Sequence, residues 1–365
     1  MSRVTEPTPP AADPRAGQTP PPVRPYQGSL DLTTLAALDG KIDSTVLGTE
    51  TKYDMADLSR LTGWTRDELD QLWLWAGLPA PDPAEMLFND SDAEGLASLR
   101  EFRDRENFEG QSLASLIRSI GTTVERLAVW QVESLAKHLG STRNLGDTAA
   151  RMEAAAFAPE QTSMLLFLIQ KLWMRHYAAA IHRLTTETIL RRGVSDDDQQ
   201  FPLVCGVGFA WIADFLDQTR NYDLPNLGRF VQEFHDQVAD IVNANGGRIV
   251  NNSGDYVIYV TARPDVGADI ALRIAEMHDA GFEGDVKGAL VWSRVLSNYG
   301  DIFGPGVNLA RMLGRVAEPN SVLIDKDTAD ALSRSGLFDF APQPEIDFAG
   351  IGLVRPVKLT RDTSG

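Results

Sequence analysis

The sequence has very little cysteine, no long apolar run and a shortage of positive charge. Its single cysteine, Cys205, excludes an internal disulfide, so we expect this thiol to be a core residue of a protein in the reducing cytoplasm. The most apolar stretch, residues 164–173, is shorter than the roughly 20 residues needed to span a bilayer. The first residues also lack an apolar signal segment. We therefore expect no association with a membrane.

Positive charge is scarce, because the chain has 34 Lys and Arg residues but 51 Asp and Glu residues, which gives a net charge of −17. Such a molecule repels phosphate backbones, so the composition argues against a nucleic acid as partner. A nucleotide ligand would have to be held locally, by a metal ion or by backbone amides.

The first half of the chain is predicted to be helical. Residues 1–28 form a Pro-rich tail that we expect to be disordered, since it has almost no aliphatic side chains to bury. Residues 29–193 show helical periodicity and predict an all-helical regulatory or dimerisation domain. Thr65 with Glu68 predicts a helix start, Gly140 and Pro159 predict helix breaks, and the last helix is expected over residues 159–192.

The second half has a different pattern, and residues 194–200 form an acidic linker before it. Residues 201–365 predict an α+β domain of ferredoxin-like order, β-α-β-β-α-β with extensions. We expect the strands and helices at 203–210 (strand), 226–245 (helix), 248–261 (two strands about a turn at 253–255), 265–280 (helix), 286–292 (strand), 307–316 (helix) and 321–324 (strand).

Three segments of this half resemble class III adenylate and guanylate cyclases, in the order and at roughly the spacing of that family. They are VGFAWIADF at 207–215, GGRIVNNSGD at 246–255 and GDIFGPGVNLA at 300–310, of which the last is the most specific. The helical half, particularly 55–78, is similar to the regulatory domain that precedes the cyclase domain in soluble actinobacterial adenylate cyclases. The resemblance implies a class III nucleotidyl cyclase domain preceded by an all-α domain.

The resemblance also implies a mechanism. In that family two domains pair head to tail, and two carboxylates of one domain hold two divalent ions, Mg²⁺ or Mn²⁺, that bind the triphosphate and activate the ribose 3′-hydroxyl. The partner domain supplies a Lys and an Asp that select adenine, and an Asn and an Arg that orient the ribose and stabilise the transition state. We therefore expect ATP or a related nucleotide as ligand, and a homodimer through the cyclase domain or a heterodimer with another cyclase.

Only half of the family's functional positions are matched. Asp255 corresponds to the second metal carboxylate, Asp301 to the adenine-selecting Asp and Asn308 to the ribose-orienting Asn. The other three positions are substituted: the first metal carboxylate is Trp211, the base-selecting Lys is Asn251 and the transition-state Arg is Met312. Trp has no oxygen to offer a hard cation, so we expect it to fill the metal pocket as a core aromatic or to stack on a base.

Three neighbours are candidates for compensation. Asp214 lies three residues after Trp211, at the family's small Gly, where its carboxylate would repel a triphosphate unless a metal intervened. Arg311 and Arg315 follow Asn308 by three and seven residues on the expected helix and offer displaced positive charge.

Three functions remain open. The first is a cyclase-family signalling protein with little or no turnover, acting as a nucleotide sensor or regulator. The second is a working adenylate cyclase that forms cyclic AMP and pyrophosphate from ATP. The third is a transcription regulator, because residues 54–78 also read as a helix-turn-helix, although acidic side chains outnumber basic ones there.

Overall fold

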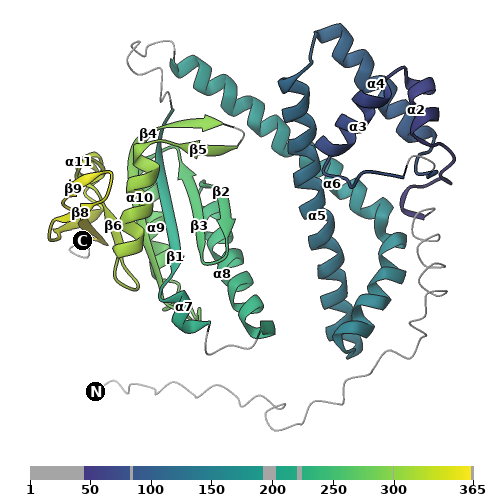
Figure 1. Ribbon diagram of the computed structural model, residues 1–365. Coiled ribbons are helices and arrows are strands. Elements are labelled where there is room, and N and C mark those ends of the chain that lie inside the picture. Colours follow the sequence, from purple (N-terminus) through teal and green to yellow (C-terminus); the bar gives the residue numbers. More distant parts are fainter. Residues whose placement is uncertain (1–44, 83–84, 192–202, 220–223, 299, 363–365) are drawn as a thin grey trace, which may run out of the picture. The chain divides into compact units, whose positions relative to one another are not determined.

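The computed structural model describes residues 45–82, 85–191, 203–219, 224–298 and 300–362 (Figure 1). The predicted tail at 1–28 and linker at 194–200 lie outside these ranges. The chain forms two compact units that divide between Tyr177 and Ala178, and each is described by itself. None of the helices within the described ranges has an apolar stretch long enough to cross a bilayer.

The N-terminal unit consists of helices, as the periodicity predicts. Their bounds are α2 (Met55–Thr62), α3 (Arg66–Trp75), α4 (Asp90–Glu106), α5 (Gln111–Arg143) and α6 (Asp147–Arg191), and the last part of α6, from Ala178, belongs to the second unit. The predicted start of α3 is confirmed, because the Thr65 side chain accepts from the backbone N–H of Glu68 and the Glu68 carboxylate accepts from that of Thr65. The same reciprocal cap begins α2 and α4. The core of this unit includes Met55, Leu58, Trp64, Leu69, Leu72, Phe88 and Leu113.

Two predicted helix breaks are wrong. Gly140 lies inside α5, which continues to Arg143 and is capped by Asn144 in the left-handed conformation. Pro159 lies inside α6, which begins at Asp147 and so starts 12 residues earlier than predicted. A proline removes one backbone donor, but four of the five residues at 154–158 are alanine, the strongest helix former, and they favour continuation of the helix.

The C-terminal unit has the predicted β-α-β-β-α-β core. Its strands are β1 (Leu203–Ile212), β2 (Arg248–Ser253), β3 (Tyr256–Thr261), β4 (Val286–Asn298), β5 (Asp301–Phe303), β6 (Val322–Ile324), β7 (Phe338–Pro342), β8 (Ile346–Phe348), β9 (Gly352–Val354) and β10 (Val357–Arg361). Its helices are α7 (Phe215–Gln218), α8 (Leu224–Ala244), α9 (Pro264–Ala275), α10 (Pro305–Val316) and α11 (Lys326–Leu332).

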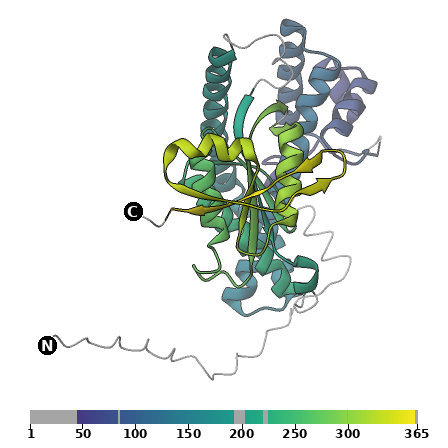
Figure 2. The ribbon, with the colours of Figure 1, turned by 90° about the vertical axis from the view of Figure 1, so that its left-hand side faces the viewer.

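The main sheet has the strand order β2-β3-β1-β4-β6-β10-β7. Strand β1 is central and antiparallel to both neighbours, whereas β6 runs parallel to β4. The first four positions in this order are those of a ferredoxin-like sheet. The residues after β6, yellow in Figure 2, add β10 and β7 to one edge.

The two faces of the sheet bury different helices, because alternate residues of a strand point to opposite faces. On one face Ala210 and Ile212 of β1 pack with α8 and α9. On the other face Phe209 and Trp211 pack with α10, and Cys205 is buried in the same cluster, as predicted. This second face positions the residues that resemble a cyclase site.

Candidate functional site

The C-terminal end of β1 brings Trp211 close to the turn that carries Asp255. Gly254 and Asp255 form the turn between β2 and β3, and Trp211 is paired with Tyr256 in the β1–β3 register. The backbone N–H of Ile212 donates to the carbonyl oxygen of Asp255 at 2.9 Å. The two positions predicted to correspond to metal carboxylates are therefore adjacent, and only one of them is a carboxylate.

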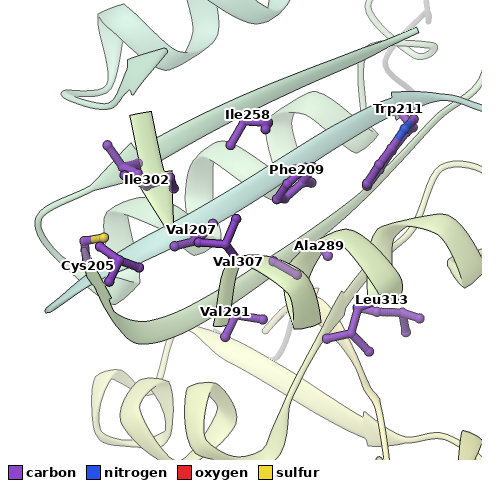
Figure 3. Close-up of a cluster of buried hydrophobic side chains, with 14 of the residues drawn as sticks. Cys205, Val207, Phe209, Trp211, Ile258, Ala289, Val291, Ile302, Val307 and Leu313 are labelled. Atoms are coloured by element: carbon purple, nitrogen blue, oxygen red, sulfur yellow. The ribbon is translucent and has the colours of Figure 1, made fainter. Parts of the chain in front are cut away.

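Trp211 is a core side chain. Only 8% of it is exposed, and its ring stacks on Phe209 with centroids 5.0 Å apart and 13° between the planes. Figure 3 shows Val207, Phe209 and Trp211 in succession along β1, with Leu313 of α10 in the same cluster. A Cβ on Gly314 would lie 2.4 Å from the Trp211 ring, so the glycine makes room for it. This packing agrees with the core interpretation of Trp211 rather than with a base-stacking platform.

A cavity of about 520 Å³ opens at this end of β1, and we call it the β1-end cavity. Its charged lining residues are Asp214, Asp217, Asp255, Lys287, Arg311 and Arg315. Asp255 and all three candidate compensators therefore share one cavity. Lys287 is an addition that sequence reasoning missed, because its position opposite Trp211 depends on the β1–β4 register.

Asp214 has a left-handed backbone conformation, which would explain why the family has a glycine at the corresponding position. Its φ of 48° and ψ of 34° are left-handed, a region that glycine enters freely and that Asp and Asn tolerate better than other residues. The carboxylate is exposed and makes no capping bond to α7. Its substitution for glycine therefore keeps the turn and adds a negative charge to the cavity.

The remaining matched positions lie in a second cavity of about 950 Å³, which we call the β5-side cavity. It is lined by Asn251 of β2, Asp301 at the start of β5 and Asn308 near the start of α10. The Asp301 Oδ1 accepts from the backbone N–H of Ile302 at 2.8 Å, which orients that carboxylate. The positions predicted to bind the metal and the base thus lie in two different cavities, and Arg311 lines both.

Met312 and its neighbours on α10 have different surroundings. Met312 is half-buried and packs against the cluster that contains Trp211, so the family's transition-state position is part of the core. Arg311 and Arg315 are exposed, and the Arg311 guanidinium carbon lies 5.6 Å from the centre of the Phe209 ring. The positive charges of α10 therefore lie at Arg311 and Arg315, beside and one turn away from the predicted arginine position at Met312.

Two further titratable side chains of this unit were not found from the sequence. Asp325 lines the β5-side cavity, and burial raises the pKa of its carboxyl although bonds from Thr328 oppose this. Burial lowers the pKa of His235 on α8, although a hydrogen bond to the backbone of Gly254 opposes this effect. Both pKa shifts depend on burial by tertiary packing, which no local sequence pattern shows.

The donor set fits one divalent ion and not two. In the part of the chain that the structure describes, no three His, Cys, Asp or Glu side chains converge into a group that could hold a metal. Mg²⁺ is commonly bound by one or two carboxylates together with substrate phosphates and water, and Asp255 with Asp214 offers such a pair. A second ion would need an oxygen at position 211, where the indole has none.

Comparisons with known proteins give relatives over most of the chain, although no protein-family model matches it. The adenylate cyclase of Glutamicibacter nicotianae is 31% identical over 335 residues, which cover 90% of this chain and 82% of the relative. The adenylate cyclase of Streptomyces coelicolor is 27% identical over 356 residues, covering 89% of this chain and 90% of the relative. An uncharacterised Mycobacterium tuberculosis protein is 28% identical over 285 residues, 77% of this chain and 72% of its own length.

Solved structures with a similar domain were also found. The catalytic core of a rhodopsin-guanylyl cyclase with converted specificity, in complex with ATPαS, aligns over 44% of this chain and 97% of its own with a TM-score of 0.40 and 20% identity. The adenylyl cyclase CyaB from P. aeruginosa aligns over 44% of this chain and 95% of its own, with a TM-score of 0.38 and 16% identity.

Proposed function

Since the chain belongs to the class III adenylate cyclase family, we propose that it is a nucleotide-binding signalling protein whose cyclase turnover is very low or absent. Its role is then to sense a nucleotide or to regulate a partner by pairing. The N-terminal helical unit is proposed as the regulatory part. With a single cysteine and ATP as the implied ligand, we assign the protein to the cytoplasm.

The observation that carries this proposal is the burial of Trp211 at the first metal position. The Trp211 ring is packed between Phe209, Tyr256 and Gly314. These contacts hold the indole in place, so it cannot rotate away and leave space for a metal ion and its water ligands. The Lys and Arg positions are also occupied by Asn251 and Met312. Loss of one electrostatic stabiliser typically lowers turnover by about 10²- to 10³-fold, although such losses are not additive within one site.

The residues that remain support nucleotide binding at a boundary between two domains. Asp255 and Asp214 would hold one Mg²⁺ or Mn²⁺, which supplies charge neutralisation for phosphate oxygens when it is bound. Asp301 and Asn308 would contact the base and ribose from the β5-side cavity. Because the two cavities are separate on one chain, a complete site needs a second domain, either a homodimer partner or another cyclase.

The surface of α6 supports the pairing of two copies. Large apolar side chains are exposed around this helix, among them Leu166 (58%), Phe167 (57%) and Trp173 (59%). Large apolar side chains exposed close together favour burial against a partner. A second copy of the chain would cover these side chains.

The binding part of the proposal is tested by the melting temperature of the purified full-length protein with and without ATP and Mn²⁺. We expect ATP to raise the melting temperature, because a ligand that binds only the folded state stabilises it. Asp301→Ala should reduce this shift, and exposed Asp339→Ala, on β7 and outside both cavities, is the matched control. Absence of any shift at millimolar ATP would contradict nucleotide binding.

A working adenylate cyclase is the second candidate. It is favoured by the relatives named adenylate cyclase and by the position of Asp214, Arg311 and Arg315 in the same cavity as Asp255. In this case the unaltered protein forms cyclic AMP and pyrophosphate from ATP, and Asp255→Ala abolishes the product. Turnover therefore separates the two candidates, whereas ATP binding is common to both.

A further inference from the structure

We propose that the N-terminal helical unit binds a small organic cation with an apolar body in a cavity beside α3. This cavity, which we call the α3 cavity, has a volume of about 250 Å³. It lies between α3, the end of α4 and the start of α5, helices that are labelled in Figure 1. The site does not depend on the proposed function, because its lining residues all belong to the N-terminal unit.

The buried part of the lining is apolar. Trp64, Leu72 and Leu113 line the α3 cavity and are at most 6% exposed. Trp75 is half-buried and adds a second indole. Apolar and aromatic walls with a few polar groups are usual for small-molecule sites, whose volumes are commonly about 300–1,000 Å³. A cavity slightly below this range suits one small ligand.

The positive charge of Arg103, which also lines the α3 cavity, is already neutralised. Its guanidinium donates to a carboxylate oxygen of Glu68 at 2.9 Å and lies 2.7 Å from a carboxylate oxygen of Asp104. The guanidinium carbon is 4.2 Å from the centre of the Trp64 ring. The lining therefore already holds one cation between an indole and a carboxylate, which is a favourable arrangement for such a group.

Two further carboxylates of the lining have no such partner. Asp67 lies in the first turn of α3 and Glu109 in the connection between α4 and α5, and both are exposed. Within the described ranges, none of the ion pairs of the N-terminal unit includes Asp67 or Glu109. Arg118 lies 6.0 Å from the centre of the Trp75 ring but does not line the cavity or pair with either carboxylate. The lining thus keeps two negative charges after Arg103 is paired with Glu68.

The combination of indoles and unpaired carboxylates selects the ligand class. An ammonium group is attracted to the face of an indole and donates charge-assisted hydrogen bonds to carboxylates. An anion would be repelled by Asp67 and Glu109, and a neutral molecule would gain from apolar contact alone. A primary amine on a short aromatic or alkyl body matches both parts of the lining, and phenethylammonium is a suitable probe.

The test is isothermal titration calorimetry of the full-length protein with phenethylammonium, with the neutral 2-phenylethanol and with the anion 3-phenylpropionate. The three probes have similar apolar bodies and differ in charge. We expect phenethylammonium to bind, and 2-phenylethanol to bind at least about tenfold more weakly because the charge-assisted hydrogen bond is lost. The anion should show no binding.

Variants of the two carboxylates locate the site. Glu109→Gln and Asp67→Asn each remove one charge and keep the shape of the side chain, so each should weaken phenethylammonium binding by about five- to tenfold. Glu125→Gln is the matched control, because Glu125 is an exposed glutamate of α5 outside the α3 cavity. It should leave the affinity unchanged.

Variants of Trp75 test the aromatic contact. Trp75→Phe keeps an aromatic face and should retain most of the affinity, whereas Trp75→Leu should weaken binding by about two- to fivefold. The melting temperature of each variant without ligand separates a lost contact from misfolding. The variants of the exposed carboxylates decide the result if Trp75→Leu does not fold.

The site would be overturned by absence of phenethylammonium binding at millimolar concentration, or by equal affinity for 2-phenylethanol. Equal affinity of Glu109→Gln, Asp67→Asn and Glu125→Gln for phenethylammonium would also overturn it. Because none of these titrations contains ATP, either result leaves the proposed nucleotide binding to be decided by its own experiment.

Discussion

At the residue scale, Trp211 and Gly314 form a matched pair. The indole occupies space at the end of β1 that only a residue without a side chain leaves open on α10, because an added Cβ would lie 2.4 Å from the ring. The large residue on the strand and the missing side chain on the helix are therefore one packing solution. Sequence reasoning identified Trp211 from the family pattern but gave no reason to connect it with Gly314, 103 residues away.

Gly314→Ala is expected to destabilise the protein by about 1–3 kcal/mol, the usual range for overpacking a core. Gly228→Ala in α8 is the control, since nothing lies within 4 Å of its added Cβ, and it should be neutral or stabilising by up to about 1 kcal/mol. Urea denaturation gives both values. In a Trp211→Ala background the effect of Gly314→Ala should shrink; an undiminished effect would contradict the pairing.

At the element scale, the sequence predicted those helices, turns and strands whose conformation is set by neighbouring residues in the chain. The reciprocal cap at Thr65 and Glu68, the turn at Gly254 and Asp255, and the apolar run of β1 all specify their own conformation. The C-terminal half of β4 and its partner β5 were not predicted, because residues 293–295 become a strand by pairing with β1, and residues 296–298 and 301–303 by pairing with each other. The strands β7 and β10 were missed for the same reason.

The charge of Asp325, at the N-terminus of the short helix α11, can be tested through the pH dependence of stability. Asp325 is its N-cap and accepts from the backbone N–H of Thr328 at 3.2 Å, while burial raises the pKa of the carboxyl. Because the folded pKa lies above the unfolded one, this group contributes most to stability below the unfolded pKa. That contribution is lost as the pH rises through the folded pKa.

Asp325→Asn keeps the cap acceptor and removes the charge, so it should be at least as stable as the unaltered protein at pH 7. Its advantage should narrow as the pH falls toward 4. Asp325→Ala lacks the acceptor and should lose about 1 kcal/mol at both pH values. Urea denaturation at pH 7 and pH 4.5 measures both differences; an Asn variant that is less stable at pH 7 than at pH 4.5, relative to the unaltered protein, would contradict the sign.

At the scale of the whole molecule, the sequence predicted candidate site residues but not how the fold divides them between two cavities. Asp255, Asp301 and Asn308 were identified from motifs, whereas their separation into two cavities follows from the strand order. Lys287 enters the β1-end cavity through the register of β4 with β1, which no local pattern contains. Long-range pairing therefore determines which charges act together.

This division bears on whether the protein binds a nucleotide, turns it over, or does both. We propose that one chain provides a metal-side carboxylate, Asp255, and a base-side Asp301 and Asn308, while three of the six predicted functional positions are substituted. Binding and turnover should consequently be separable in this protein, with binding retained and turnover nearly lost.

The most direct test is the rate of cyclic AMP formation from saturating ATP and Mn²⁺, measured by mass spectrometry for the unaltered full-length protein and for Asp255→Ala purified in parallel. We predict that the two preparations differ little, at a rate close to the background of the assay. Rapid formation of cyclic AMP by the unaltered protein, lost in Asp255→Ala, would contradict it.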